Sequence, residues 1–160
     1  MRRTTIAMAA AALVLAGSAA ASAGGRAAAL ESGADVIAGR QAAFRMSGAV
    51  FGGLRAAGER GGDPKSQAFA ARSLAGWARA IPGMFPAGSG GGKSAALPAI
   101  WSDRAGFEAR AAAYAAAADK LAAFAAAGDA EGFKAQLREV GASCGSCHDT
   151  YRKPEERRPG

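Results

Sequence analysis

The two cysteines and the single histidine of this chain stand together near its C-terminus, in the order Cys144-Gly145-Ser146-Cys147-His148. On a helix, residues at i, i+3 and i+4 share one face, so both thiols and the imidazole would lie on the same side. A C-x-x-C-H sequence indicates a c-type haem attachment site. The two thiols bond to the two vinyl groups of one haem, and the adjacent imidazole reaches its iron. The sequence therefore predicts one covalently bound haem c, with Cys144 and Cys147 as thioether residues and His148 as axial iron ligand.

Three other interpretations of the cysteine pair are weaker. A disulfide between Cys144 and Cys147 would close a very small loop and would stabilise the fold little. A thioredoxin-like redox pair sits near a βαβ pattern, and no segment of this chain alternates with the period of a strand. A zinc site usually takes four protein ligands, and two cysteines with one histidine fall short of that set.

The sixth coordination position of the iron has few candidate ligands. With one histidine in the chain, a haem held by two histidines of the same chain is excluded. Met46 follows Phe44 by two residues, about 200° around a helix, and should point away from the face that buries Phe44. Met84 lies in a segment rich in Pro and Gly, where ligation would need a specific loop conformation. If Phe44, which cannot bind iron, lies over the distal face, the iron is five-coordinate and faces a small apolar cavity.

Four helices must position this motif. The chain is rich in alanine, the residue with the highest helix propensity, and apolar residues repeat every seven positions within the segments. The predicted helices run over about residues 31–57, 64–81, 103–127 and 130–153. Two short connections and one long connection over residues 82–100 favour antiparallel neighbours. The sequence predicts an all-α fold, an antiparallel four-helix bundle with covalently bound haem.

Local signals mark the ends of these helices. Asp63, which stands before a proline, is the expected N-cap of the second helix. Ser102 is the expected N-cap of the third helix. Gly128 should end that helix, and Asp129 should cap the fourth. Residues 24–30, rich in Gly and Ala, are expected to be loose.

The N-terminal stretch has the pattern of an export signal. A basic pair at residues 2–3 precedes an apolar run over residues 6–16 and a small-residue site at residues 21–23. The apolar run is shorter than the roughly 20 residues of a transmembrane helix, so no stable membrane insertion is expected. A buried N-terminal helix is the weaker alternative. The sequence predicts a cleaved signal peptide over residues 1–23, a single domain over residues 24–160, and a periplasmic location.

The charge of the chain does not indicate a nucleic-acid partner. The formal net charge is +7, and a basic protein can bind an anionic surface. Here the positive charges are scattered along the chain, and no aromatic residues interleave with them. A solvated basic surface is the expected interpretation, and no nucleic acid is predicted as a partner.

With these motifs, the sequence resembles the cytochrome c' family, the class II c-type cytochromes, over about residues 33–153. The C-terminal attachment motif is the most specific part, because most c-type cytochromes outside this class carry the motif near the N-terminus. The residues that carry the resemblance are Arg40-Gln41 followed by Phe44, Ile100-Trp101-Ser102-Asp103, and the run from Val140 to Lys153 around the haem motif.

The resemblance implies roles for particular residues. Arg40 and Gln41 match residues that approach the haem propionates, and Phe44 matches the position that faces the sixth coordination site. Arg152 matches a basic residue near the proximal face. Family members are often homodimers, with contacts made largely by the first two helices. Their iron is typically high-spin and five-coordinate, and it binds NO and CO.

Each of these roles has a simpler alternative. Arg40 lies on the buried stripe of its helix, where a charge partner is expected. Phe44 would then be ordinary core, and Arg152 would complement the C-terminal end of its helix. Trp77 and Trp101 are expected to be packing residues.

The predicted function is that of a periplasmic c-type haem protein with five-coordinate high-spin iron, which binds NO or CO, transfers electrons, or does both. NO and CO bind without a hydrogen-bond donor, which the distal side is expected to lack. The alternative is a six-coordinate low-spin class II cytochrome acting purely as an electron carrier. An enzyme such as a peroxidase is not predicted, because no distal histidine is available for acid–base chemistry. The sequence does not indicate the redox partner protein.

Overall fold

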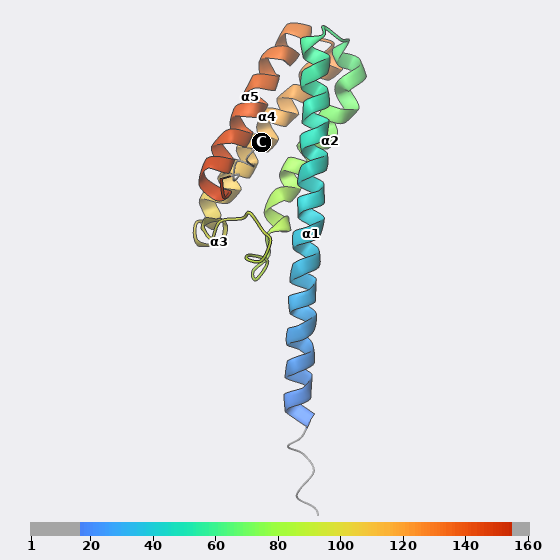
Figure 1. Cartoon of the computed structure of the whole chain (residues 1–160). Helices are drawn as coiled ribbons and strands as arrows, with labels where there is room; N and C mark the ends of the chain where they lie inside the picture. Colours follow the sequence, from blue (N-terminus) through green and yellow to red (C-terminus); the bar gives the residue numbers. More distant parts are fainter. Residues whose placement is uncertain (1–16, 155–160) are drawn as a thin grey trace, which may run out of the picture.

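The computed structural model describes residues 17–154, and side chains from residue 33 onward. Its four long helices run antiparallel, each returning beside the one before it (Figure 1). The predicted all-α, antiparallel four-helix bundle is confirmed. The long helices are α1 (Gly17–Glu59), α2 (Ala68–Ala80), α4 (Arg104–Ala127) and α5 (Ala130–Tyr151).

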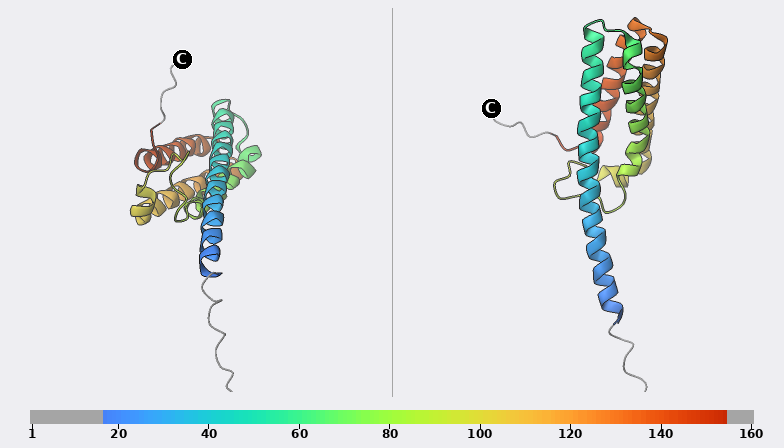
Figure 2. Two further views of the ribbon diagram at one scale, coloured as in Figure 1. Left: turned by 60° about the horizontal axis from the view of Figure 1, so that its bottom comes forward. Right: turned by 90° about the vertical axis from the view of Figure 1, so that its right-hand side faces the viewer.

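The first helix extends well beyond the rest of the bundle. The N-terminal part of α1 stands apart from the other helices in both views of Figure 2. Residues 24–30 are helical, so the expectation of a loose segment there is wrong. Alanine has the highest helix propensity, and the run of alanines outweighs two adjacent glycines. Residues 1–16 of the predicted leader lie outside the described residues, so cleavage stays a prediction. Within residues 17–154, no helix is long and apolar enough to cross a membrane.

Alanine lets two of the helices approach closely. The buried faces of α2 and α4 consist largely of this residue, including Ala71, Ala75, Ala78, Ala111, Ala115, Ala118, Ala122 and Ala125. Because alanine has no side-chain rotamers, burying it costs no side-chain conformational entropy. By contrast, α1 packs less extensively against α2 and α5. The bundle is therefore tight on the α2–α4 side and leaves space beside α1.

Aspartates cap three helical segments. Asp63 accepts a hydrogen bond from the Lys65 amide at 2.9 Å and opens a 3₁₀ turn, η1 (Pro64–Gln67), which leads into α2. Asp129 accepts one from the Gly132 amide at 2.9 Å and caps α5, as predicted. The third cap was expected at Ser102, and that expectation is wrong.

The N-cap of α4 is Asp103, whose carboxylate accepts from the Gly106 amide at 3.2 Å. Ser102 instead ends a separate turn, α3 (Ala99–Ser102). The preceding Pro98 supplies φ near −55° for this turn. The chain thus enters the long helix one residue later.

The long connection joins the end of α5. After a 3₁₀ turn, η2 (Ile81–Met84), the chain runs irregularly to α3. The Lys153 amide donates to the carbonyl of Ala95 at 2.8 Å, and the Leu97 amide donates to the carbonyl of Tyr151 at 3.0 Å. Because residues 152–153 pair with the connection in this extended way, α5 ends at Tyr151.

Candidate functional site

A cavity of about 750 Å³ lies between α1, α2, α4, α5 and the long connection. Cys144, Cys147 and His148 all line it, from one face of α5. Its volume lies within the range of cofactor pockets. Most of its wall is apolar, with an aromatic set consisting of Phe44, Phe51, Trp77, Phe85, Phe107, Tyr114 and Tyr151. The helix therefore presents both thiols and the imidazole to one apolar space.

The cysteine pair is free and half-buried. No bond joins Cys144 to Cys147. Burial in the cavity wall raises the pKa of both thiols. Within residues 17–154, no group of three or more His, Cys, Asp or Glu residues could hold a metal ion. Both thiols are therefore available to bond to a cofactor.

The cavity is lined by positive charge. None of the described residues that line it is Asp or Glu. Its basic residues are Arg40, Arg45, Lys93, Arg110 and Arg152. An acid-free, cationic rim favours an occupant that carries negative charge. A haem, with an apolar macrocycle and two carboxylates, fits this combination of apolar wall and basic rim.

Arg40 is the most deeply buried charged residue, with 2% of its surface exposed. Its Nη1 donates to Ser89 Oγ at 2.8 Å and to the carbonyl of Met84 at 3.3 Å. Its Nη2 donates to the Ser89 carbonyl at 2.7 Å and to Ser94 Oγ at 2.8 Å. The guanidinium carbon lies 4.3 Å from the centre of the Phe85 ring. Arg40 therefore holds the long connection against α1.

Among the described residues, no carboxylate pairs with the charge of Arg40. None of the ion pairs among the described residues includes it. Burial lowers its pKa from the usual arginine value. Buried charges are normally paired, so an anionic group entering the cavity would compensate this one. Beside it, Gln41 Nε2 donates to the carbonyl of Lys93 at 3.0 Å and fixes a second point of the connection.

Phe44 lies in the cavity wall among other aromatic rings. Its ring centre is 5.0 Å from that of Trp77, with an interplanar angle of 86°, and 6.1 Å from that of Phe85. Met46, two residues on, is 70% exposed and does not line the cavity. Met84 packs against the core but is also absent from the lining.

Two side-chain contacts lie at the C-terminal end of α5. Arg152 Nη1 lies 3.5 Å from His148 Nδ1, and both residues line the cavity. The Tyr151 hydroxyl donates to Asp103 Oδ2 at 2.7 Å. This hydrogen bond raises the pKa of Tyr151. A Cβ at Gly106 would lie 2.6 Å from the Tyr151 hydroxyl oxygen, so glycine lets α4 approach this contact.

Three contributors to the site were missed from the sequence. Tyr151 ties α5 to the cap of α4, and Arg104 donates to the carbonyls of Pro82 and Phe85 in the connection. Trp77, expected to be a packing residue, lines the cavity. The spacing of Tyr151 three residues after His148 was the one local signal available. The other contacts depend on the path of the connection.

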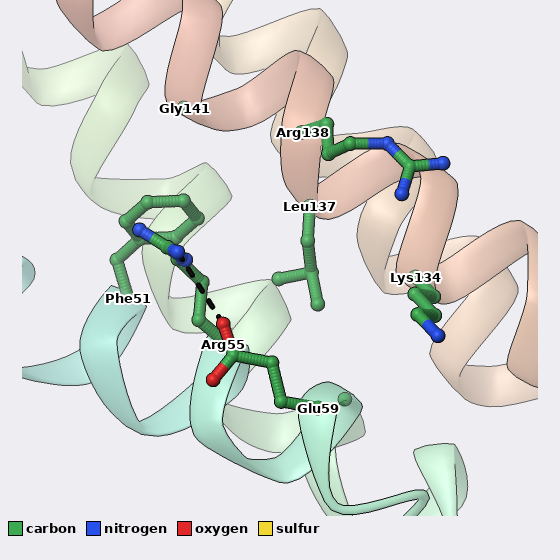
Figure 3. A pocket seen from close by; sticks show the side chains of 8 residues that line it. Phe51, Arg55, Glu59, Lys134, Leu137, Arg138 and Gly141 are labelled. Atoms are coloured by element: carbon green, nitrogen blue, oxygen red, sulfur yellow. Dashed lines mark hydrogen bonds and ion pairs between the residues drawn. The ribbon is translucent and has the colours of Figure 1, made fainter.

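A second hollow of about 400 Å³ lies between α1 and α5, away from the haem motif. Figure 3 shows Phe51 and Leu137 facing each other across it, with the Arg55–Glu59 ion pair at one side. Of its lining residues, only Phe51 also lines the larger cavity. The described residues that line this second hollow include no cysteine, no histidine and no member of the aromatic pairs described above.

Known proteins match the chain over most of the bundle. The family model described as Cytochrome C' matches residues 35–152. A cytochrome c-556 of Agrobacterium tumefaciens (strain II Chrys) is 38% identical over 115 residues, which cover 71% of this chain and 93% of the relative. A cytochrome c' of Rubrivivax gelatinosus is 37% identical over 123 residues, covering 74% of this chain and 95% of the relative.

Solved structures agree with these matches. A nitric oxide complex of a mutant cytochrome c prime from Alcaligenes xylosoxidans has a TM-score of 0.71 and 32% identity. The alignment covers 77% of this chain and 97% of that one. The cytochrome c' of Rubrivivax gelatinosus has a TM-score of 0.68 and 35% identity, covering 74% and 95%. The similarity thus extends over the helices that enclose the cavity.

Proposed function

Because the chain belongs to the cytochrome c' family, whose members bind haem c covalently, we propose that it binds NO and CO at a five-coordinate haem iron. Cys144 and Cys147 form the thioethers, and His148 is the axial ligand. When bound, the haem supplies an iron that accepts a diatomic ligand and can change oxidation state. Arg40 and Gln41 face the propionates, Phe44 the distal side, and Arg152 the proximal side.

The observation that carries this proposal is the make-up of the cavity wall. Among the described residues that line it, none is a methionine, and His148 is the one histidine of the chain. Met46 is exposed on the other side of α1. Phe44 occupies the wall instead and offers no lone pair to iron. These residues leave the position opposite His148 without a strong protein ligand.

The packing of Phe44 bears on ligand entry. Its ring contacts Trp77 and Phe85, and each aromatic pair contributes about 0.5–1.5 kcal/mol beyond burial. A ligand that enters on this side must displace the Phe44 ring, and Phe44 then loses its contacts with Trp77 and Phe85. A small, neutral molecule needs the least displacement and loses little hydration in an apolar space.

A low-spin electron carrier is the second candidate function. Several similar proteins are named cytochrome c-556 or cytochrome c-554 rather than cytochrome c'. A six-coordinate iron would need a strong ligand opposite His148, and the wall described above favours the first candidate. A five-coordinate haem can still transfer electrons, so ligand binding and electron transfer are compatible with one site.

The absorption spectrum of the haem-loaded protein separates these functions. We expect a high-spin ferric spectrum, and a ferrous spectrum that changes on addition of CO and of NO, because no protein ligand competes for the sixth position. Measurement before and after each gas, at equal haem concentration, gives the result. A low-spin ferrous spectrum that CO leaves unchanged would contradict the proposal and support the electron carrier.

Proteins of the cytochrome c' family are periplasmic, and this supports export of the chain. The basic pair, apolar run and small-residue site at the N-terminus suit a cleaved signal. We propose that residues 1–23 are removed and that residues 24–160 form the haem-bearing domain. Haem attachment would then follow export.

We also propose a homodimer through the exposed face of α1. One stripe of this helix carries small or apolar residues that are all exposed: Ala38, Ala42, Met46, Ala49 and Gly53. Small residues let two helices approach closely, and exposed apolar patches often mark interfaces. In a two-fold dimer the same residue meets its copy or a near neighbour. Met46 would thus be buried on assembly.

The substitution Met46→Glu is expected to convert the dimer to monomer, because the two-fold axis would bring like charges together in a dehydrated contact. Sedimentation velocity at micromolar concentration measures the change. Lys120→Glu, at an exposed position of α4, is the matched control and should leave the dimer intact. Wild-type protein that sediments as a monomer at this concentration would rule out the interface.

A further inference from the structure

One indole of the chain is satisfied and the other is not. Trp101 Nε1 donates to the carbonyl of Pro86 at 3.1 Å. Trp77 Nε1 is buried and is the one such side-chain nitrogen or oxygen among the described residues without a hydrogen-bond partner. Buried donors are normally paired, and an exception calls for an explanation. Leaving this N–H without an acceptor costs the free energy of its lost hydration.

The position of Trp77 suggests where an acceptor could come from. Its side chain lines the cavity, and its ring meets Phe44 edge to face at 5.0 Å. The neighbouring Ala75 and Ala78 are fully buried against the bundle, which fixes this turn of α2. Phe44 and Trp77 are both half-buried, but α1, which carries Phe44, packs less extensively against its neighbours than α2 does. Of the two rings, Phe44 is therefore the one that can move.

We propose that Trp77 is a covered hydrogen-bond donor for the diatomic ligand, reached when the ligand displaces Phe44. This inference rests on the proposed function, since it needs a ligand opposite His148. In the resting site Phe44 packs on the indole and the N–H has no acceptor. Displacement of Phe44 brings the distal atom of the ligand into the space beside the indole. The hydrogen bond then offsets part of the aromatic contact that entry removes.

The arrangement makes ligand retention depend on polarity. The basic groups at the rim are engaged elsewhere or exposed; Arg40, for example, gives both terminal nitrogens to the connection. Trp77 supplies a buried neutral donor next to Phe44. A neutral donor favours a ligand with a partial negative charge at its far atom, without the desolvation cost of a charged group. This proposal differs from the sequence-based expectation, which gave the distal side no hydrogen-bond donor.

The variant Trp77→Phe tests this donor, because it keeps an aromatic ring and removes the N–H. In the ferrous CO complex we expect the C–O stretching band to move to higher wavenumber. We also expect CO to dissociate about two- to tenfold faster, the loss of one neutral hydrogen bond. Infrared spectroscopy and ligand-replacement kinetics measure the two effects. Trp101→Phe is the matched control and should leave the band in place.

A second measurement needs no substitution. Transfer of the wild-type CO complex into D₂O exchanges the indole N–H for N–D, and a hydrogen-bonded C–O band is expected to shift slightly. A band that is identical in both solvents and in Trp77→Phe would overturn the inference. An unchanged band together with an altered midpoint potential in Trp77→Phe would also overturn it, and would assign the N–H to a haem carboxylate.

The variant Phe44→Ala separates failure of this inference from failure of the proposed function. Removal of the ring should speed CO association about tenfold or more, because the aromatic contacts need not be broken. If association is faster but the Trp77→Phe band is unmoved, the donor alone is rejected. If the wild-type protein does not bind CO at all, the proposed function itself is rejected.

Discussion

Replacement of both Cys144 and Cys147 by Ser is expected to yield a polypeptide that loses all of its colour in acid–acetone, whereas the wild-type chain keeps its haem. The two sulfurs are the groups of the cavity wall that can form thioethers. The remaining link, the bond from the His148 imidazole to the iron, is not a thioether and does not withstand acid–acetone. Without sulfur, no bond to the haem then survives unfolding.

Single substitutions and a neighbouring serine supply the controls. Cys144→Ser and Cys147→Ser should each keep colour, because one thioether is enough to retain the haem. Ser143→Ala, beside the motif in the same cavity wall, should behave as the wild type. Absorption of the washed polypeptide, with its mass by mass spectrometry, gives the result. A colourless wild-type polypeptide with the mass of the bare chain would remove the basis of every role assigned above.

Sequence reasoning succeeded where geometry is local. The spacing of the cysteines and the histidine places all three on one face of any helix, and all three line one cavity. The exposed position of Met46 follows from the same rotation relative to Phe44. Helix ends set by Asp63 and Asp129 depend on neighbouring residues alone. The family match, in turn, comes from motifs that are contiguous in the chain.

The contacts that the sequence did not predict depend on the irregular connection. Its path has no periodicity, so nothing local predicted that Ser89 and Ser94 would meet Arg40. The extra turn of α3 likewise moved the N-cap from Ser102 to Asp103 and brought that carboxylate to Tyr151. An unsatisfied donor such as Trp77 Nε1 can be recognised only when all of its neighbours are placed.

The connection also leads to the largest expected change in stability. Arg40→Met is expected to destabilise the haem-loaded protein by about 3 kcal/mol or more. The substitution keeps an apolar stem and removes the donors to the Ser89 and Met84 carbonyls and to two hydroxyls. Hydrogen bonds to charged groups contribute about 1.5–3 kcal/mol each, and they do not add fully when they share one group. Ser89 Oγ keeps its bond to Pro86, which limits the loss.

Urea unfolding of the ferric protein, followed by absorption and by circular dichroism, measures this change. Arg72→Met is the matched control, since Arg72 is exposed on α2 and lines neither cavity, and surface substitutions usually stay within about 0.5 kcal/mol. Arg40→Lys keeps the charge but removes the planar guanidinium group, whose two terminal nitrogens donate to separate acceptors in the connection. If the charge toward the haem carboxylates were the whole role of Arg40, Lys would restore stability. If Arg40 mainly holds the connection, Arg40→Lys will recover only part of the stability that Arg40→Met loses. If Arg40→Met and Arg40→Lys are both as stable as the wild type, the anchoring role is refuted.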